Sequence, residues 1–296
     1  MDPFVVLITV LALLALLLGI GVWVGLSLFA VAIISLALFR SMPVEKLLAQ
    51  LTYNTVTTPE MVALPMFILM AEILFHTRLS ASLFKGLSPW TNKLPGRMVH
   101  VNVLGCTLFA AISGSSAATA TTVGRITLSE LFRRGYDKDL VIGSLAGAGT
   151  LGFLIPPSII LIIYGVLSET SILKLFIAGI VPGLILALGF MGYLAIRATL
   201  NPSLIPSEDS NPTWRDRLNG LVDLGPVVFL ILLVLGSMYA GFASPSEAAA
   251  VGVLGAVLVS AAQKTLSWNT IRMACLGAVR TTSMICLLYT SPSPRD

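Results

Sequence analysis

A run of 36 residues without a charged side chain, near the start of the sequence, limits what this chain can fold into. The run extends from Phe4 to Phe39 and is almost entirely apolar. About 20 apolar residues in a helix are enough to cross a lipid bilayer. Only 11% of all residues are charged, whereas a soluble domain has about 25%. The sequence therefore predicts a membrane protein with several spans, and excludes a soluble domain, a disordered chain and a secreted disulfide scaffold.

The same run is too long for one straight span. A helix of 36 residues extends about 54 Å, and the hydrocarbon core of a bilayer is about 30 Å thick. Gly19, Gly21 and Gly25 offer places to turn, so the sequence predicts either two helices or one long bent helix. The net charge of +4 is too small to indicate nucleic-acid binding. In a membrane protein, such an excess usually marks cytoplasmic loops.

Residues 97–124 form the first unusual segment, because a transmembrane length of chain has a polar centre. Small and hydroxyl-bearing side chains fill residues 113–122. Basic residues flank the segment on both sides, namely Lys93, Arg97, Arg125, Arg133, Arg134 and Lys138. By the positive-inside tendency, both ends should lie in the cytoplasm. We therefore expect a re-entrant hairpin whose polar tip is buried in protein or lines a wet cavity near the middle of the membrane.

Residues 139–166 form the second unusual segment, which is long and hydrophobic but interrupted. Three glycines (Gly147, Gly149 and Gly152) precede the pair Pro156–Pro157. Two consecutive prolines remove two backbone donors and disfavour a helical conformation before them. The sequence predicts a broken helix here.

The other elements follow from hydropathy and from proline positions. We expect an interfacial arm at 42–58, a span at 60–75, a short amphipathic helix at 79–90 and a further span at 172–198. The segment 199–220 is polar and rich in proline, which predicts a cytoplasmic linker.

This linker divides the chain into a first transmembrane repeat, residues 1–198, and the start of a second repeat, residues 221–288. Residues 18–22 resemble residues 240–245, and inverted repeats build many secondary transporters. Residues 289–296 resemble read-through of vector sequence, so we expect a fragment whose second repeat is incomplete.

The polar tip and the helix break together favour ion binding. A hard cation such as Na⁺ prefers oxygen ligands, and unwound backbone supplies carbonyl groups. Ser113, Ser115, Ser116 and Ser158 can add hydroxyl groups, which makes these four the candidate Na⁺ ligands. The N-termini of half-helices favour an anion. The alternative is that the small residues only let helices pack closely.

Motifs that occur in family order resemble the large membrane (M) subunit of tripartite ATP-independent periplasmic (TRAP) transporters, the DctM-like proteins. The matching segments are residues 64–69, 109–120, 134–137, 149–158, 175–183 and 243–250. The chain departs from the family at residues 20–22, where the family usually has a proline after the early glycine. It also lacks the family's complete second half.

The resemblance implies an all-α, polytopic helical bundle of the elevator type in the bacterial inner (cytoplasmic) membrane. It implies a Na⁺-coupled importer of organic acids, meaning carboxylates such as dicarboxylates, keto acids or sugar acids. The implied partners are a small membrane (Q) subunit and a periplasmic substrate-binding (P) protein, with Na⁺ as coupling ion and no cofactor. Carried over onto this chain, the cation and substrate site comprises Ser113, Gly114, Ser115, Ser116, Thr119, Gly152, Pro156, Pro157 and Ser158.

Two other functions stay open on the sequence. One is an anion/cation symporter that needs no binding protein, and the other is a membrane enzyme or an assembly subunit without transport activity. The sequence contains no Walker phosphate loop, no Ser-His-Asp grouping and no metal-binding cluster. We therefore do not expect an enzyme.

Two carboxylates need a separate explanation. Glu72 lies within a span, where carboxylates often mark functional sites, but it is four residues before His76 near the helix end, which favours an interfacial side chain. Glu247 follows Ser244 and Pro245 in the order of a capping box, with proline at the first helical position. Helix initiation therefore accounts for Glu247 without a role in a site.

Overall fold

The computed structural model describes residues 3–22, 24–39, 59–77, 79–206 and 212–290, with single positions between residues 46 and 53. All regular elements in these residues are helices, so the prediction of an all-α fold is confirmed, and several of the helices are apolar, as expected for a membrane protein. The chain forms two compact units. The first contains residues 1–58 and 280–296, and the second contains residues 59–279.

The described helices of the first unit are α1 (Pro3–Gly19), α2 (Val24–Phe39) and the last part of α13 (Trp268–Thr290). The uncharged run is thus two helices, α1 and α2, and not one long bent helix. The turn between them includes Gly21 with φ of 84°, a conformation that glycine adopts without steric cost. The arm expected at 42–58 lies outside the described residues, apart from single positions.

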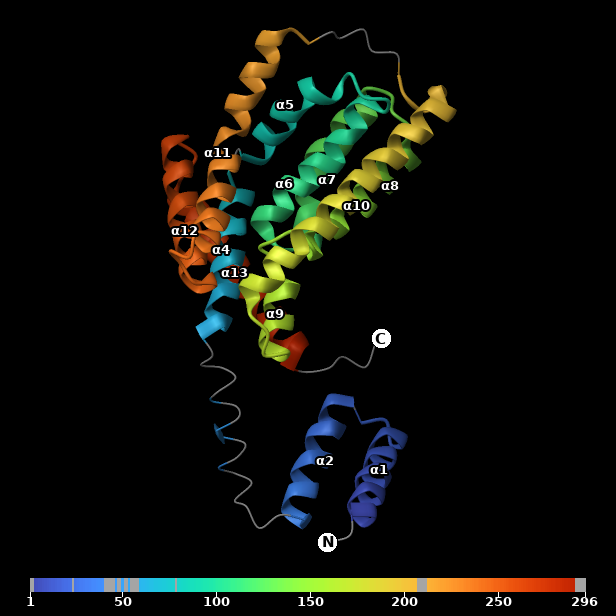
Figure 1. The fold of residues 1–296 in the computed structure, drawn as a ribbon, viewed down its shortest axis with the longest axis vertical. Helices are drawn as coiled ribbons and strands as arrows, with labels where there is room; N and C mark the ends of the chain where they lie inside the picture. The colour runs from blue at the N-terminus through green and yellow to red at the C-terminus, as the bar shows by residue number, and fades with distance from the viewer. Residues whose placement is uncertain are drawn as a thin grey trace. The chain divides into compact units, whose positions relative to one another are not determined.

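The second unit contains most of the protein (Figure 1). In chain order its elements are η1 (Pro59–Val62), α4 (Ala63–Phe75), α5 (Leu79–Thr91), η2 (Arg97–Val99), α6 (His100–Ser113), α7 (Ser116–Arg133), α8 (Lys138–Gly149), η3 (Thr150–Phe153), α9 (Ile159–Leu167), α10 (Ile172–Leu200), η4 (Pro202–Leu204), α11 (Trp214–Tyr239), α12 (Pro245–Ala262) and the first part of α13 (Trp268–Thr290). Among the described helices, α10, α11 and α12 are long and apolar enough to cross a membrane.

Close helix contacts through glycine hold α4, α5, α11 and α12 together. Where α5 crosses α11, a Cβ atom added to Gly86 would lie 2.8 Å from the Gly220 carbonyl oxygen, and one added to Gly220 would lie 2.7 Å from the Gly86 carbonyl oxygen. Between α4 and α12, a Cβ atom added to Gly252 would lie 2.6 Å from the Met70 sulfur. Small residues at such contacts let helices approach closely in a membrane.

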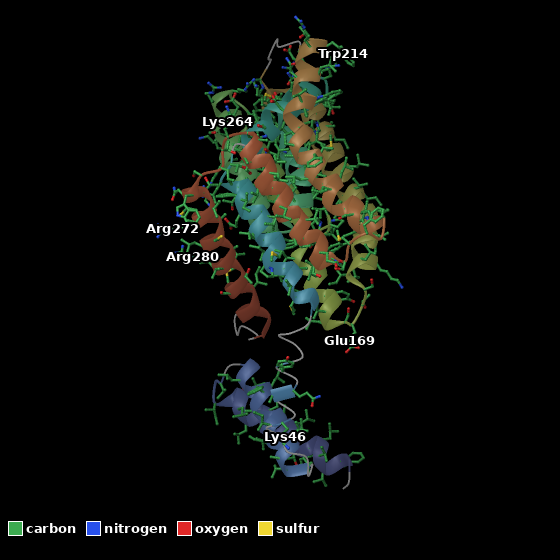
Figure 2. All side chains as sticks on the ribbon, turned by 90° about the vertical axis from the view of Figure 1, so that its left-hand side faces the viewer. Lys46, Glu169, Trp214, Lys264, Arg272 and Arg280 are labelled. Carbon is green, nitrogen blue, oxygen red and sulfur yellow. The ribbon has the colours of Figure 1, made fainter. Side chains whose placement is uncertain are left out.

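The turns at one end of the second unit are bound to one another. The Asp137 amide donates to the Leu204 carbonyl over 3.1 Å, and Arg97 Nη1 donates to the Pro206 carbonyl over 3.0 Å. We call this the basic end, because its turns and adjoining helix termini contain Lys93, Arg97, Arg133, Arg134, Lys138 and Arg197. The turn between α9 and α10 contains Glu169 and no basic residue. Figure 2 shows Glu169 and Trp214 far apart along the long axis of this unit.

The segment expected as a linker, 199–220, is helical at both its ends. Helix α11 begins earlier than expected because Thr213 and Asp216 form a capping box: the Thr213 amide donates to Asp216 Oδ2 over 2.8 Å, and the Asp216 amide donates to Thr213 Oγ1. The predicted capping box at the start of α12 is confirmed, since Ser244 and Glu247 make the same two bonds. Residues 207–211 lie outside the described part of the chain.

Candidate functional site

Helices α6 and α7 are joined by a turn of only two residues and lie side by side (Figure 1). Gly114 ends α6 with φ of 60°, in the left-handed region, where an L side chain is strained. Ser115 has an extended backbone, and its hydroxyl accepts a hydrogen bond from the Ala118 amide at the start of α7. Helix α7 continues to Arg133, nine residues beyond the segment 97–124 expected for the hairpin.

The chain from α8 to α9 is interrupted for nine residues. Helix α8 ends at Gly149, a short 3-10 turn follows, and α9 begins only at Ile159. The peptide bond between Pro156 and Pro157 is cis. These prolines lack the amide hydrogen that a helix needs, so the backbone is non-helical where they stand. The Ser158 hydroxyl donates to the Phe153 carbonyl over 2.8 Å and holds the loop together.

The hairpin turn and the interrupted segment meet through backbone atoms. The Ile159 amide donates to the Gly114 carbonyl over 3.0 Å. A Cβ atom added to Gly114 would lie 2.5 Å from the Pro157 carbonyl oxygen, and one added to Gly152 would lie 2.8 Å from the Ser116 amide nitrogen. We call this backbone contact the crossing. All nine site residues predicted from the sequence lie at or beside it. They are Ser113, Gly114, Ser115, Ser116, Thr119, Gly152, Pro156, Pro157 and Ser158.

Polar oxygen atoms are concentrated at the crossing. The hydroxyl groups of Ser113 and Thr119 are hydrogen-bonded over 2.9 Å, and both residues are fully buried, as is Ser158. Pro156 and Pro157 are also buried, and their carbonyl oxygens accept no hydrogen bond from any described residue. A carbonyl oxygen without a partner in the described chain can accept a hydrogen bond from water or bind a ligand. The crossing therefore presents oxygen atoms that a ligand could satisfy.

The crossing has no charged side chain of its own. Residues 101–124 and 140–168 contain no Asp, Glu, Lys, Arg or His. The positive ends of the α7 and α9 dipoles point into it, because both helices begin there, and such N-termini attract anions. The arrangement can thus offer carbonyl and hydroxyl oxygens to a cation and helix N-termini to an anion.

Two features that support the crossing were not expected from the sequence. Gly149 packs closely on Ala120: a Cβ atom added to Gly149 would lie only 2.9 Å from the Ala120 Cβ. Asn102, which is fully buried on α6, donates from Nδ2 to the Ser144 hydroxyl over 2.8 Å and ties the hairpin to α8. A lone asparagine in an apolar helix was the signal that could have identified this second link.

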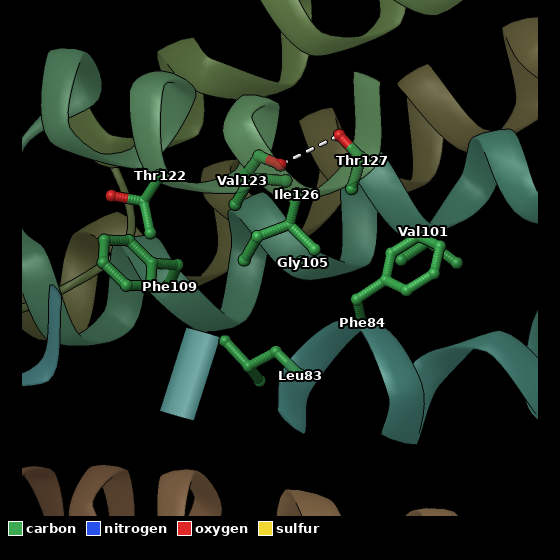
Figure 3. A pocket seen from close by; sticks show the side chains of 9 residues that line it. All are labelled: Leu83, Phe84, Val101, Gly105, Phe109, Thr122, Val123, Ile126 and Thr127. Atoms are coloured by element: carbon green, nitrogen blue, oxygen red, sulfur yellow. Dashed lines mark hydrogen bonds between the residues drawn. The ribbon is translucent and has the colours of Figure 1, made fainter. Parts of the chain in front are cut away.

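Helix α5 packs on the hairpin through an apolar contact (Figure 3). Leu83 and Phe84 of α5 face residues of α6 and α7, and the cavity left between them is only about 10 Å³. The Thr127 hydroxyl donates within its own helix, to the Val123 carbonyl over 2.9 Å. The cavity is too small for an organic substrate, since even one water needs about 10–15 Å³, so it does not compete with the crossing as a site.

Glu72 lies outside the crossing. Its carboxylate is 3.6 Å from the His76 ring, and a Cβ atom added to Gly277 on α13 would lie 2.5 Å from Glu72 Oε2. The side chain is one quarter exposed. Neither of these contacts involves any of the nine residues of the crossing.

At the opposite end of the hairpin, Glu130 accepts hydrogen bonds from two arginines of the basic end. Arg133 Nη2 donates to it over 2.6 Å, and Arg134 Nε donates over 2.8 Å. These two hydrogen bonds hold the pKa of the Glu130 carboxyl below its usual value. The carboxylate is therefore ionised at neutral pH and fixes the turn between α7 and α8.

The ordered matches along the chain extend well beyond the crossing. Residues 11–293 match the family model described as the tripartite ATP-independent periplasmic transporter, DctM component. The chain belongs to this family. The DctM family is one of transporter permeases, and the crossing occupies the central part of the matched range.

Several curated members of the DctM family are similar in sequence. The ectoine/5-hydroxyectoine TRAP transporter large permease protein UehC of Ruegeria pomeroyi is 34% identical over 76% of this chain and 52% of its own length. The C4-dicarboxylate TRAP transporter large permease protein DctM of Pseudomonas aeruginosa is 36% identical over 68% of this chain and 46% of its own length. The isethionate TRAP transporter permease protein DctMQ of Oleidesulfovibrio alaskensis is 31% identical over 97% of this chain and 44% of its own length. The chain spans about half the length of these relatives.

Proposed function

We propose that the crossing is one half of the binding site of a Na⁺-coupled secondary importer for organic acids. The observation that supports this most directly is the meeting of two interrupted helices through their backbones at Gly114 and Pro157. Interrupted helices with free carbonyl groups and exposed N-termini are typical of ion-coupled transporter sites.

Na⁺ fits the groups at the crossing. The carbonyl oxygens of Pro156 and Pro157 have no partner among the described residues, and Na⁺ as a hard cation prefers such ligands. Ser158 uses its hydroxyl hydrogen on Phe153, which leaves its oxygen lone pairs for a cation. The candidate ligands Ser113, Ser115 and Ser116 lie on the facing hairpin turn.

An organic anion fits the other feature of the crossing. The first amides of α7, at Ser116 and Ala117, donate no hydrogen bond to any described residue. A carboxylate at a helix N-terminus is stabilised by such amides and by the helix dipole. Relatives are named for C4-dicarboxylate, for isethionate and for ectoine. We therefore propose that the transported substrate is an organic acid. The binding protein that delivers the substrate would select the individual compound.

The proposed setting is the bacterial inner membrane, with the basic end in the cytoplasm by the positive-inside tendency. Both ends of the hairpin belong to the basic end, so α6 and α7 would enter and leave by the same face as a re-entrant hairpin. The apolar contact of α5 with the hairpin suits an elevator movement, because sliding there breaks few hydrogen bonds.

The proposed partners are a small membrane (Q) subunit and a periplasmic substrate-binding (P) protein. One relative is a permease named DctMQ, which favours close association of the M part with a Q part. These partners belong to the complete transporter, of which this chain spans about half the M subunit.

Sodium titration of uptake by the complete transporter tests the proposal. Ser115→Ala removes a hydroxyl group, and Pro157→Ala restores a backbone donor that lets the segment rewind. Each change removes about 1–3 kcal/mol of ligand or hydrogen-bond stabilisation, and about 1.4 kcal/mol is tenfold in affinity. The sodium concentration for half-maximal uptake should rise several-fold to about a hundredfold.

Ser129→Ala is the matched control. Ser129 is exposed on the same helix α7, and its hydroxyl donates only to the Ile126 carbonyl. This variant should keep the sodium midpoint of the unmodified protein. If Ser115→Ala and Pro157→Ala lower only the maximal rate and keep that midpoint, the crossing does not bind the coupling ion.

A further inference from the structure

A groove of about 630 Å³ lies between α8 and α10, apart from the crossing. The two helices run next to each other (Figure 1). Its lining is mostly apolar and glycine-rich and includes Asp139, Gly143, Ile185, Gly189, Tyr193 and Arg197. This volume is in the range of a small-molecule pocket, about 300–1,000 Å³.

Glycines on both helices leave the groove open. A Cβ atom added to Gly143 or to Gly189 would meet nothing within 4 Å. A Cβ atom added to Gly147, in contrast, would lie 3.2 Å from the Phe190 ring. The large side chains around the groove, Ile185 and Tyr193, are exposed by 63% and 58%, so described protein atoms do not fill it.

The groove is about as long as one leaflet of a bilayer. Along α8 it extends from Asp139 to Gly147, which is about 12 Å of helix, and along α10 from Ile185 to Arg197, which is about 18 Å. Half of the hydrocarbon core is about 15 Å. A groove of this length that starts at the basic end is long enough to reach near the middle of a membrane crossed by the two helices.

Both charged residues of the lining lie at the basic end of the groove. Asp139 is in the first turn of α8, Arg197 is in the last turn of α10, and both are exposed. Neither forms an ion pair with a described residue. Tyr193 stands one turn deeper on α10, where an aromatic residue with a polar group suits the membrane interface.

We infer that this groove binds one phospholipid of the inner leaflet, and that the lipid carries a primary ammonium group in its headgroup, as phosphatidylethanolamine does. An acyl chain lies along the glycines of the groove. The phosphate takes charge-assisted hydrogen bonds from Arg197, and the ammonium group donates to the Asp139 carboxylate.

Charge complementarity favours a lipid over a protein helix as the occupant. An apolar helix laid over the groove would cover Asp139 and Arg197 without supplying a partner for either, which is unfavourable for buried charges. A purely anionic headgroup satisfies Arg197 and is repelled by Asp139. Only a headgroup with both charges satisfies the two residues, and this sets the order of preference among phospholipids.

A photoreactive lipid tests the site directly. The purified chain is reconstituted in nanodiscs with a phosphatidylethanolamine that carries a diazirine in its acyl chain, and labelled peptides are mapped by mass spectrometry. We expect label on α8 and α10 around Gly143 and Gly189. Absence of label from both segments overturns the inference and indicates that another part of the protein covers the groove.

Two glycines of α10 provide a matched pair of variants. An added Cβ atom meets nothing within 4 Å at Gly189 and at Gly192, but only Gly189 lines the groove. Gly189→Leu should lower the labelling of α8 several-fold, whereas Gly192→Leu should leave it unchanged. Equal labelling in the two variants identifies bulk lipid around the protein and overturns the inference.

Competition by unlabelled lipids tests the headgroup. Phosphatidylethanolamine should displace the probe better than phosphatidylglycerol, which has no ammonium group. Asp139→Asn should abolish this preference, and Arg197→Gln should weaken both competitors about tenfold, since a charge-assisted hydrogen bond is lost. Arg215→Gln, an exposed arginine outside the groove, is the control. A preference that survives Asp139→Asn, or an Arg197→Gln variant that behaves like the control, overturns the assignment of the headgroup.

Discussion

Helix α8 and the turn that follows it contain glycines in two opposite settings. At Gly152 and Gly149 an added Cβ atom would lie 2.8 Å and 2.9 Å from atoms of the hairpin. At Gly143, nearer the basic end, the same atom would meet nothing within 4 Å. At the crossing, glycine lets two backbones touch, whereas at the groove it leaves space for a molecule that is not part of the described chain.

The comparison separates two uses of glycine that look alike in the sequence. At Gly152 the neighbours are backbone atoms of Ser115 and Ser116, which cannot move without displacing the hairpin turn. At Gly143 no neighbour has to move. The effect of one added methyl group should therefore differ in size, and even in sign, within ten residues of chain.

The largest effect is expected for Gly152→Ala. The added methyl group must push the Ser115–Ser116 backbone away from the interrupted segment, and overpacking of this kind costs about 1–3 kcal/mol. We expect the midpoint of thermal unfolding in detergent to fall by several degrees, measured by the fluorescence of a thiol dye or of tryptophan. Gly143→Ala is the control: it is neutral or stabilises the helix by up to about 1 kcal/mol. Equal midpoints for the two variants would remove the distinction between the crossing and the groove.

An intermediate effect is expected for Gly277→Ala on α13. Here the added methyl group lies 2.5 Å from the Glu72 carboxylate, the end of a flexible side chain that can turn aside. We expect a destabilisation below about 1 kcal/mol, smaller than that of Gly152→Ala.

A double-mutant cycle identifies the cause of that effect. Glu72→Ala removes the group that the new methyl would strike, so in the Glu72→Ala background Gly277→Ala should no longer destabilise the protein and should be neutral or slightly stabilising, as at Gly143. An undiminished loss of stability in that background would assign the effect to helix α13 itself and not to the contact with Glu72.

Much of the fold follows from apolar runs and from helix-terminating residues. The uncharged run after Phe4, the proline pair at Pro156 and the capping residues at Ser244 each mark a boundary that local chemistry determines. The early start of α11 was missed although its signal, Thr213 three residues before Asp216, is local as well. The linker composition around it, rich in proline and polar residues, outweighed that signal.

The candidate site divides in the same way. The sequence nominated residues on two segments, because serine and glycine clusters and a proline pair are visible locally. The contacts of Gly152 with Ser116 and of Gly149 with Ala120 could not be predicted from the sequence, since contacts between helices depend on how the helices pack in three dimensions. The groove was missed for a stronger reason. It arises from the absence of side chains at positions more than forty residues apart, Gly143 and Gly189, and that absence acquires a meaning only when the two helices lie together.

The smallest effect is expected far from the crossing, at the basic end of the same hairpin. Glu130→Gln removes the charge that pairs with Arg133 and Arg134, and partly exposed pairs of this kind contribute about 0.2–1 kcal/mol. Because folding lowers the pKa of the Glu130 carboxyl, its stabilisation is complete above the unfolded pKa, about 4.3, and is lost as the pH falls through the lower, folded value.

Thermal unfolding between neutral pH and about pH 3 measures this small difference. The unmodified chain should exceed Glu130→Gln by at most a few degrees at pH 7, and the gap should close on acidification and shrink in high salt. The loss is smaller than at Gly152 because Glu130 can exchange its arginine partners for water, whereas the backbone contact at the crossing has no such replacement. A loss at Glu130→Gln as large as that of Gly152→Ala would mean that the hairpin depends as much on its charged end as on its tip, and would contradict the special role of the crossing.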